Sequence, residues 1–255
     1  MIEFRIRSFL QYWLDAVDEH SLHSPFLFDL YTRIIKGKAE WHTETENLRR
    51  SLQNNRSLLQ YEDPGAGSVR MKKIRNLAGL ARIATTPPKY AALYARLANW
   101  VNARYAVELG TCLGLTTPYL AAPHRKVYTF EGVPQLADLA QHHFESLKLS
   151  GVHLIRGNLD VTLRPTLEQI PAVDFALIDA NHRYKPTINY ANQIFKKVHP
   201  ASVVVVDDIH LNPEMEKAWH QLRTHPLVYC SADLYRCGLL FFNPSVYRLH
   251  VVLQF

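Results

Sequence analysis

The sequence predicts an α/β protein built around a doubly wound, mostly parallel sheet. Short apolar runs recur through the second half of the chain, and amphipathic stretches with helical spacing separate them. Buried parallel strands read as such apolar runs, and helices connect them. The 255 residues are 47% hydrophobic and 20% charged, which excludes a disordered chain and allows a sizeable core.

The first hundred residues are predicted to form a helical extension. Ser24 followed by Pro25 is typical of a helix start, and Gly37 is a suitable stop. The expected helices cover residues 8–17, 25–36, 40–59 and 88–101. We expect a helical extension with a lid loop over residues 1–85 and a sheet domain over residues 86–255.

Beyond residue 103, strands and helices are expected to alternate. The predicted strands are residues 105–109, 126–131, 152–156, 174–179 and 202–208. The predicted helices are residues 116–122, 134–150, 162–169, 186–198 and 213–224. Three further apolar runs, at residues 227–233, 237–242 and 248–255, follow without an intervening helix. The sheet should therefore end in antiparallel strands.

The net charge of +6 is concentrated in one window. Residues 64–90 contain six basic residues and no acidic one, so this window accounts for the whole excess. Such a window binds anions or forms a solvated helix face, and the sequence leaves both interpretations open.

The cysteines and the apolar runs indicate the cellular compartment that we expect for the protein. Cys112, Cys230 and Cys237 form no CxxC pair and lie in apolar stretches, which favours core positions in a reducing compartment. No apolar run is long enough to span a bilayer, and charged residues interrupt the amino terminus. We expect a soluble, cytoplasmic protein that does not enter a membrane.

The ends of the first two predicted strands suggest an adenosine ligand. Glu108 and the turn from Gly110 to Gly114 follow the first strand, and Glu131 ends the second. In parallel sheets ligands bind at this edge, and an acidic residue at this spacing accepts hydrogen bonds from ribose hydroxyls. Cys112 replaces the middle glycine of a dinucleotide fingerprint, and Glu108 would repel a pyrophosphate but attract an ammonium group.

Together, these motifs resemble class I S-adenosylmethionine-dependent methyltransferases. The motifs are E-x-G-x-C-x-G at 108–114, Glu131, D-F-A-L-I-D-A-N-H at 174–182 and V-V-V-V-D-D-I-H at 203–210. The nearest subgroup is the O-methyltransferases similar to catechol, caffeoyl-CoA and macrocin-type enzymes, over about residues 86–242. The resemblance implies a Rossmann-like methyltransferase fold and S-adenosylmethionine as cofactor.

The resemblance also implies which residues bind this cofactor. Glu108 and the turn residues Gly110, Thr111 and Gly114 would surround its methionine part, and Glu131 its ribose. The remaining cofactor positions are Asn158, Asp160 and Asp179. For Asn158 and Asp160, a turn or helix cap after Gly157 is an equal alternative.

Three carboxylates follow the later strands, at Asp179, Asp207 and Asp208. The metal-dependent members of the resembling subgroup have Asp, Asp and Asn at these positions and hold magnesium there. In this chain Asp208 replaces the Asn, which keeps an oxygen ligand for Mg²⁺ or another divalent cation but adds a negative charge. The resemblance leaves the need for a metal open.

His182 is the candidate catalytic base, with Asp179 beside it. It falls where the catechol subgroup has a basic Lys, and histidine accepts a proton near neutral pH. His210 is a second candidate for this role.

We therefore expect methyl transfer to a hydroxyl of a small molecule, with an acidic acceptor and a homodimer as further expectations. Three alternatives stay open: a methyltransferase of RNA or another polyanion, a non-catalytic interaction protein with a cofactor fold, and a nicotinamide oxidoreductase. The absence of a base-methylating N-P-P-Y motif argues against nucleic acid, and the absent G-x-G-x-x-G against the oxidoreductase.

Overall fold

The computed structural model describes residues 2–62 and 72–255, and of residues 61–62 and 72–75 it describes the backbone alone. The chain forms two compact units that interleave along the sequence. Unit 1 comprises residues 1–38, 96–102 and 171–255, and unit 2 comprises residues 39–95 and 103–170. The sequence predicts a lid over residues 63–90, and its first part, residues 63–71, lies outside the described residues.

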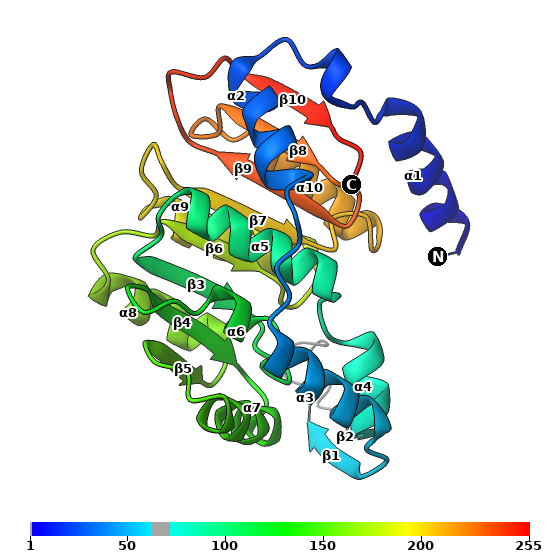
Figure 1. Ribbon diagram of the computed structural model, residues 1–255, viewed down its shortest axis with the longest axis vertical. Coiled ribbons are helices and arrows are strands. Elements are labelled where there is room, and N and C mark those ends of the chain that lie inside the picture. Colours follow the sequence, from blue (N-terminus) through cyan, green and yellow to red (C-terminus); the bar gives the residue numbers. More distant parts are fainter. Residues whose placement is uncertain (1, 63–71) are drawn as a thin grey trace. The chain divides into compact units, whose positions relative to one another are not determined.

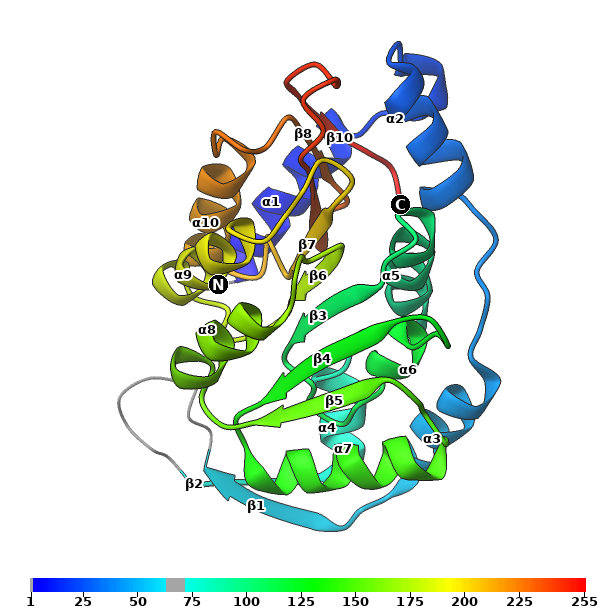
Figure 2. The ribbon, with the colours of Figure 1, turned by 90° about the vertical axis from the view of Figure 1, so that its left-hand side faces the viewer.

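Unit 2 contains three parallel strands in the order β3-β4-β5 (Figure 2). Helix α7 runs beside β5 in this view, and helix α5 (Pro88–Trp100) begins in unit 2 and ends in unit 1. The strands are β3 (Tyr105–Leu109), β4 (Lys126–Glu131) and β5 (Val152–Arg156). The other helices are α3 (Thr43–Asn54), α4 (Leu77–Ile83), α6 (Thr117–Leu120), α7 (Pro134–Ser146) and α8 (Leu159–Gln169). All three strands have their predicted bounds.

Unit 1 contains five strands in the order β10-β8-β9-β7-β6 (Figure 1). They are β6 (Phe175–Ile178), β7 (Val203–Asp207), β8 (Cys230–Asp233), β9 (Cys237–Phe241) and β10 (Leu249–Val252). The helical segments are α1 (Ile2–Asp15), η1 (Glu19–Ser21), α2 (Pro25–Asp29), the π-helical η2 (Leu30–Ile35), α9 (Tyr184–Phe195) and α10 (Pro213–Arg223). The predicted cap is confirmed, because the Ser24 hydroxyl accepts a hydrogen bond from the Leu27 amide at 3.5 Å.

The eight strands β3 to β10 make up one mixed, mostly parallel sheet, as predicted. The prediction of an antiparallel end is confirmed for β9, which runs antiparallel to β7 and β8, but is wrong for β10. That strand pairs with β8 in the parallel direction. Because β7 and β8 already flank β9, the last strand joins the other side of β8, and the reversal after β9 returns it to the direction of β8.

The segment after α3 differs from the prediction. Helix α3 ends at Asn54 instead of about residue 59, and strand β1 (Leu58–Glu62) pairs antiparallel with β2 (Lys72–Asn76). Two consecutive asparagines follow the last buried residue of the helix, Leu52, and asparagine has a weak helix propensity. Part of the basic window is therefore a strand.

Each unit has its own apolar core. In unit 2, Leu52, Leu80, Leu113 and Leu136 belong to one cluster that joins α3, α4 and α7 to the turn after β3. In unit 1, all residues of β6, β7, β8 and β9 are buried. The predicted core positions of Cys230 and Cys237 are confirmed, whereas Cys112 is only half-buried. Within the described part of the chain, no helix is both long and apolar enough to cross a membrane.

Candidate functional site

The turn after β3 is held in a left-handed conformation. Gly110, Cys112 and Gly114 have φ angles of 102°, 51° and 66°. The amides of Gly110 and Thr111 both donate to the Phe130 carbonyl oxygen, at 3.1 and 3.0 Å, so the turn folds over the end of β4. A Cβ atom at Gly114 would lie 2.7 Å from the Phe144 ring. Glycine at 114 thus makes room for a side chain of helix α7, and its contact with a cofactor stays a prediction.

Glu131, at the end of β4, is fixed against this turn. Its Oε2 accepts a hydrogen bond from the Cys112 amide, and its Oε1 accepts one from the Val133 amide, both at 2.8 Å. The residue is 8% exposed. A carboxylate held by two backbone amides has a defined orientation.

Glu108 is fully buried beneath the turn. Its Oε2 accepts hydrogen bonds from the Thr117 and Thr129 hydroxyls, both at 2.6 Å, and the Thr111 and Thr129 hydroxyls lie 2.6 Å apart. Oε1 has no partner among the described residues. Burial raises the pKa of Glu108 to about 7, although the two threonine hydroxyls oppose this change. The site therefore holds a buried acid that lacks a donor at one oxygen.

Asn158 and Asp160 lie at the start of α8. The Asn158 side chain accepts a hydrogen bond from the Asp160 amide at 2.9 Å, which makes it the N-cap of this helix. Both residues are exposed. The capping interpretation thus accounts for Asn158 without a ligand, and contact with a cofactor stays a prediction for both residues.

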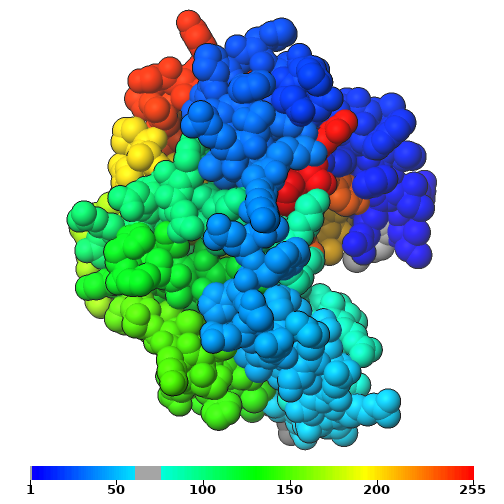
Figure 3. Space-filling view, in the orientation of Figure 1, coloured from blue at the N-terminus to red at the C-terminus, as the bar shows by residue number. Residues whose placement is uncertain are grey.

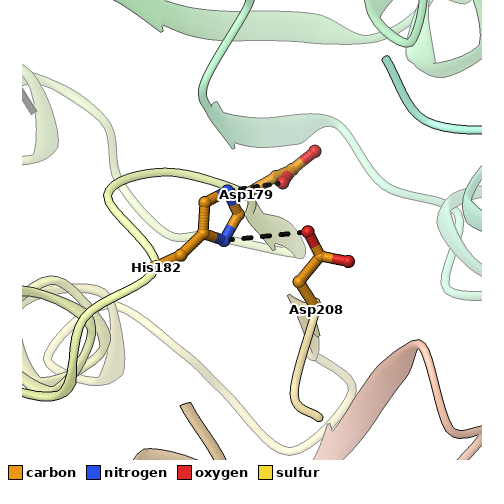
Figure 4. A group of neighbouring side chains, drawn as sticks. All are labelled: Asp179, His182 and Asp208. Carbon is orange, nitrogen blue, oxygen red and sulfur yellow. Dashed lines mark ion pairs between the residues drawn. The ribbon is translucent and has the colours of Figure 1, made fainter. Parts of the chain in front are cut away.

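Three candidate residues of unit 1 come together after β6 and β7: Asp179, His182 and Asp208 (Figure 4). The His182 Nε2 lies 3.7 Å from the Asp179 Oδ1, and its Nδ1 lies 4.0 Å from the Asp208 Oδ2. One ligand atom from each residue lies within 4.8 Å of the others, so the group has the dimensions of a cation site. Each carboxylate, however, faces a different nitrogen of the ring.

The backbone at this group is strained. Asn181, His182 and Asp208 have φ angles of 66°, 41° and 54°. Non-glycine residues in left-handed conformations cost on the order of 1–3 kcal/mol each and concentrate at functional sites. The loops after β6 and β7 thus hold these side chains in positions that a relaxed backbone would not give.

Asp207 does not join this group, contrary to the set of three carboxylates that the sequence suggested. It is fully buried and pairs with Arg236, whose Nη2 lies 3.0 Å from Asp207 Oδ2 and whose Nε lies 3.2 Å from Oδ1. Arg236 was missed from the sequence. Strand β9 pairs with β7 so that Asp207 faces Cys237, which brings the preceding arginine to the end of β7. A basic residue in the turn between two predicted C-terminal strands was the available signal.

His210 points away from the group. Its Nε2 lies 2.8 Å from Asp233 Oδ2 and its Nδ1 lies 3.5 Å from Glu216 Oε1. Burial lowers the pKa of His210, but the hydrogen bond and the negative charges outweigh this effect, so the pKa is raised overall. His182 is therefore the better candidate base.

Comparison with known proteins gives one family match and several structural matches. A family model described as a methyltransferase domain matches residues 107–209. An uncharacterised protein, R132, of Acanthamoeba polyphaga mimivirus is 30% identical over 113 aligned residues, in a match that covers 40% of this chain. The chain spans half the length of this relative.

Three solved structures illustrate the shared fold. The O-methyltransferase TomG of Streptomyces achromogenes has a TM-score of 0.54 and 22% identity, over 62% of this chain and 82% of its own. An O-methyltransferase of Bacillus cereus has a TM-score of 0.52 and 18% identity, over 62% and 83%. The methyltransferase PaMTH1 of Podospora anserina has a TM-score of 0.59 and 12% identity, over 87% and 97%.

These matches agree with the strand order and with the residues at the strand ends. The family match runs from Val107 in β3 to Ile209 after β7, so it includes Glu108, Glu131, Asp179, His182 and Asp208. The chain has the Rossmann-like fold of these solved methyltransferases, and its residues 107–209 match a family model described as a methyltransferase domain.

Proposed function

We propose that the protein transfers a methyl group from S-adenosylmethionine to a hydroxyl of a small molecule. The observation that carries the proposal is Glu131, held by two amides at the end of β4 beside the glycine turn, within a methyltransferase domain. The solved structures of TomG, the Bacillus cereus enzyme and PaMTH1 contain S-adenosylmethionine or S-adenosylhomocysteine. Their cofactor supports the same choice here.

The residues of unit 2 fit this cofactor by their chemistry. Glu131 would accept hydrogen bonds from the ribose hydroxyls. Glu108 Oε1 has no donor among the residues that the structure describes, and the ammonium group of the methionine part would supply one, directly or through a water molecule. Thr111 belongs to the same hydroxyl network, and Asn158 and Asp160 would lie toward the adenine. The bound cofactor would supply an electrophilic methyl group on its sulfonium.

The residues of unit 1 would act on the acceptor. We assign His182 as the base that removes the proton from the acceptor hydroxyl. Asp179 and Asp208, each facing one ring nitrogen, would orient the imidazole and stabilise its protonated form (Figure 4). A positioned base of this kind contributes roughly 10²- to 10⁴-fold to the rate.

Methyl transfer to a panel of hydroxyl acceptors tests the proposal. The panel would include catechols, sugars and acidic phenols, with the formation of S-adenosylhomocysteine as readout. The variant His182→Ala should lose about 10²-fold or more in kcat while its affinity for S-adenosylhomocysteine stays unchanged. His199→Ala, on a partly exposed histidine paired with Asp174, is the matched control. Equal loss in both variants would remove His182 from the reaction.

The acidic acceptor remains part of the proposal. The sequence excess of positive charge between residues 64 and 90 would attract it, although the Arg82 Nη2 already donates to the Gln53 carbonyl oxygen at 2.9 Å. Comparing KM for a carboxylated and an uncarboxylated acceptor at low and high salt would measure this attraction.

We also propose that helix α1 pairs with α1 of a second copy to form a homodimer. Six large apolar side chains of this helix are between 47% and 78% exposed: Ile2, Ile6, Phe9, Leu10, Trp13 and Leu14. Figure 3 shows the helix, in deep blue, at the surface. Together, these six side chains expose on the order of 700 Å² of surface. This is close to the ~800 Å² that each partner contributes to a standard interface.

Charge favours an antiparallel pair. The first half of α1 carries Arg5 and Arg7 against one acidic residue, Glu3, whereas the helix ends at Asp15, and Asp18 and Glu19 follow it. An antiparallel arrangement would bring these opposite charges together. Light scattering should find a dimer that Ile6→Glu converts to a monomer and that Glu3→Gln leaves intact. A monomeric wild-type protein would exclude the dimer.

A further inference from the structure

Arg236 occupies a position that matters for the question of a metal. In the subgroup that the sequence resembles, the positions of Asp179, Asp207 and Asp208 hold magnesium. Here the Arg236 guanidinium lies against two of these three carboxylates. If the guanidinium always occupies this position, it leaves no room for a magnesium ion between these carboxylates.

The contacts of Arg236 favour a permanent ion pair. Its Nε lies 3.2 and 3.3 Å from the two carboxylate oxygens of Asp207, and its Nη2 lies 3.0 Å from Oδ2. The same Nη2 lies 3.6 Å from the Asp208 Oδ1. Asp207 is fully buried, so its charge requires a partner at all times.

The backbone also holds Arg236 in place. Its carbonyl oxygen accepts a hydrogen bond from the Ile209 amide at 3.1 Å, and its own amide donates to the Leu234 carbonyl oxygen at 2.8 Å. The adjacent Cys237 is paired with Asp207 across β9 and β7. The arginine is thus tied to the loop after β7, and its side chain does not depend on a flexible segment.

A magnesium ion does not fit this arrangement. Magnesium requires oxygen ligands at about 2.0–2.1 Å in octahedral geometry. To bind Asp207, it would have to displace the guanidinium from a buried carboxylate and remain close to a second positive charge. The three carboxylates proposed from the sequence therefore do not form a magnesium site together.

We infer that the Arg236 guanidinium takes the place of the divalent cation, so that the enzyme works without a bound metal. The inference rests on the proposed function. The charges agree with it, because Asp208 adds one negative charge relative to the Asn of the resembling subgroup and Arg236 adds one positive charge. Arg236 is a positioning residue: it fixes Asp207 and Asp208, and Asp208 faces His182.

The arrangement of His182 agrees with this inference. One cation can bind only one nitrogen of an imidazole, but Asp179 faces Nε2 and Asp208 faces Nδ1. A ring between two carboxylates is suited to accept a proton at one nitrogen while the other is oriented. A transition metal on Asp179, His182 and Asp208 is the competing outcome of the experiment below.

Metal binding to the purified full chain tests the inference without an acceptor. Calorimetric titration of the wild-type protein with Mg²⁺ and with Mn²⁺ should show no binding tighter than about 1 mM. Arg236→Gln, which uncovers Asp207 and Asp208, should gain at least tenfold in affinity for Mn²⁺. Arg248→Gln, which removes an exposed arginine of the same unit, is the control and should gain nothing.

Two results would overturn the inference. The first is binding of Mg²⁺ or Mn²⁺ to the wild-type protein at micromolar concentration that Asp208→Asn abolishes. The second is a folded Arg236→Gln protein with no gain. If Arg236→Gln does not fold, the titration of the wild-type protein still tests whether the site binds a metal. Arg236→Lys, which keeps a positive charge at this position, should bind no metal.

A parallel titration with S-adenosylhomocysteine separates this inference from the proposed function. A protein that binds S-adenosylhomocysteine and also binds a metal tightly contradicts only the role of Arg236. A protein that does not bind S-adenosylhomocysteine contradicts the proposed function, whatever the metal titration shows. With an active acceptor, excess chelator should leave the rate within twofold.

Discussion

Replacement of the buried acid Glu108 by glutamine should change how stability depends on pH. In the folded protein burial raises the pKa of this group from 4.5 to about 7. Between these two values the folded protein keeps a proton that the unfolded chain has lost. The free energy of unfolding should therefore fall as the pH rises through this window and level off above about 7.

The size of the effect follows from the same values. At about 1.4 kcal/mol per pKa unit, the carboxyl costs the folded protein about 3 kcal/mol at pH 8 relative to pH 4.5. Glutamine has the same shape but no charge, so Glu108→Gln should lack this loss. Its Oε can still accept hydrogen bonds from Thr117 and Thr129. The amide at the other position lacks a partner, and that cost does not depend on pH.

The assay is urea unfolding at several pH values from 4.5 to 8.5, without cofactor. The stability of Glu108→Gln relative to wild type should rise by about 3 kcal/mol across this range. Glu168→Gln, which removes a carboxylate with 60% side-chain exposure, controls for the substitution itself. Parallel pH profiles for wild type and Glu108→Gln would refute the argument that burial controls this group.

The affinity for the cofactor should also depend on the ionisation of Glu108. An ammonium group beside Glu108 favours the ionised carboxylate, so the affinity of the wild-type protein for S-adenosylhomocysteine should increase from pH 6 to pH 8 and that of Glu108→Gln should not. Glu131→Ala should weaken this affinity by roughly 1.5–3 kcal/mol, because hydrogen bonds to an ionised partner are lost, and an unchanged titration curve would remove Glu131 from the site. Gly238→Ala should lower the urea midpoint, because its Cβ would lie 2.4 Å from the buried Trp219 ring; overpacking costs about 1–3 kcal/mol, and an unchanged midpoint would contradict this packing.

Strands β3 and β4 were predictable because most of their residues are buried, and buried strands have apolar sequences. The runs at residues 105–109 and 126–131 are strands with those bounds, and so is the run at residues 152–156, although no residue of β5 is fully buried. Polar strands outside the core have no such apolar pattern in their sequence. Strands β1 and β2, with the sequences LLQYE and KKIRN, show neither an apolar run nor strict alternation, and tertiary pairing decides their structure.

The positions of the candidate residues at the strand ends were predictable, because they depend only on where each strand stops. Glu131 is the last residue of β4, and Asp179 and Asp208 directly follow β6 and β7. The family match extends over all three residues, and their roles stay predictions. The pairing of Asp207 with Arg236 was not predictable in the same way. It depends on the register of β9 against β7, which joins residues 29 positions apart, and no local pattern encodes that register.

Calorimetric titration of the full chain with S-adenosylhomocysteine, beside a titration with NAD, tests the central claim most directly. The account predicts one saturable site for S-adenosylhomocysteine per chain, weakened in Glu131→Ala, and no measurable heat of binding for NAD. Binding of NAD without binding of S-adenosylhomocysteine, or no binding of either, would contradict it.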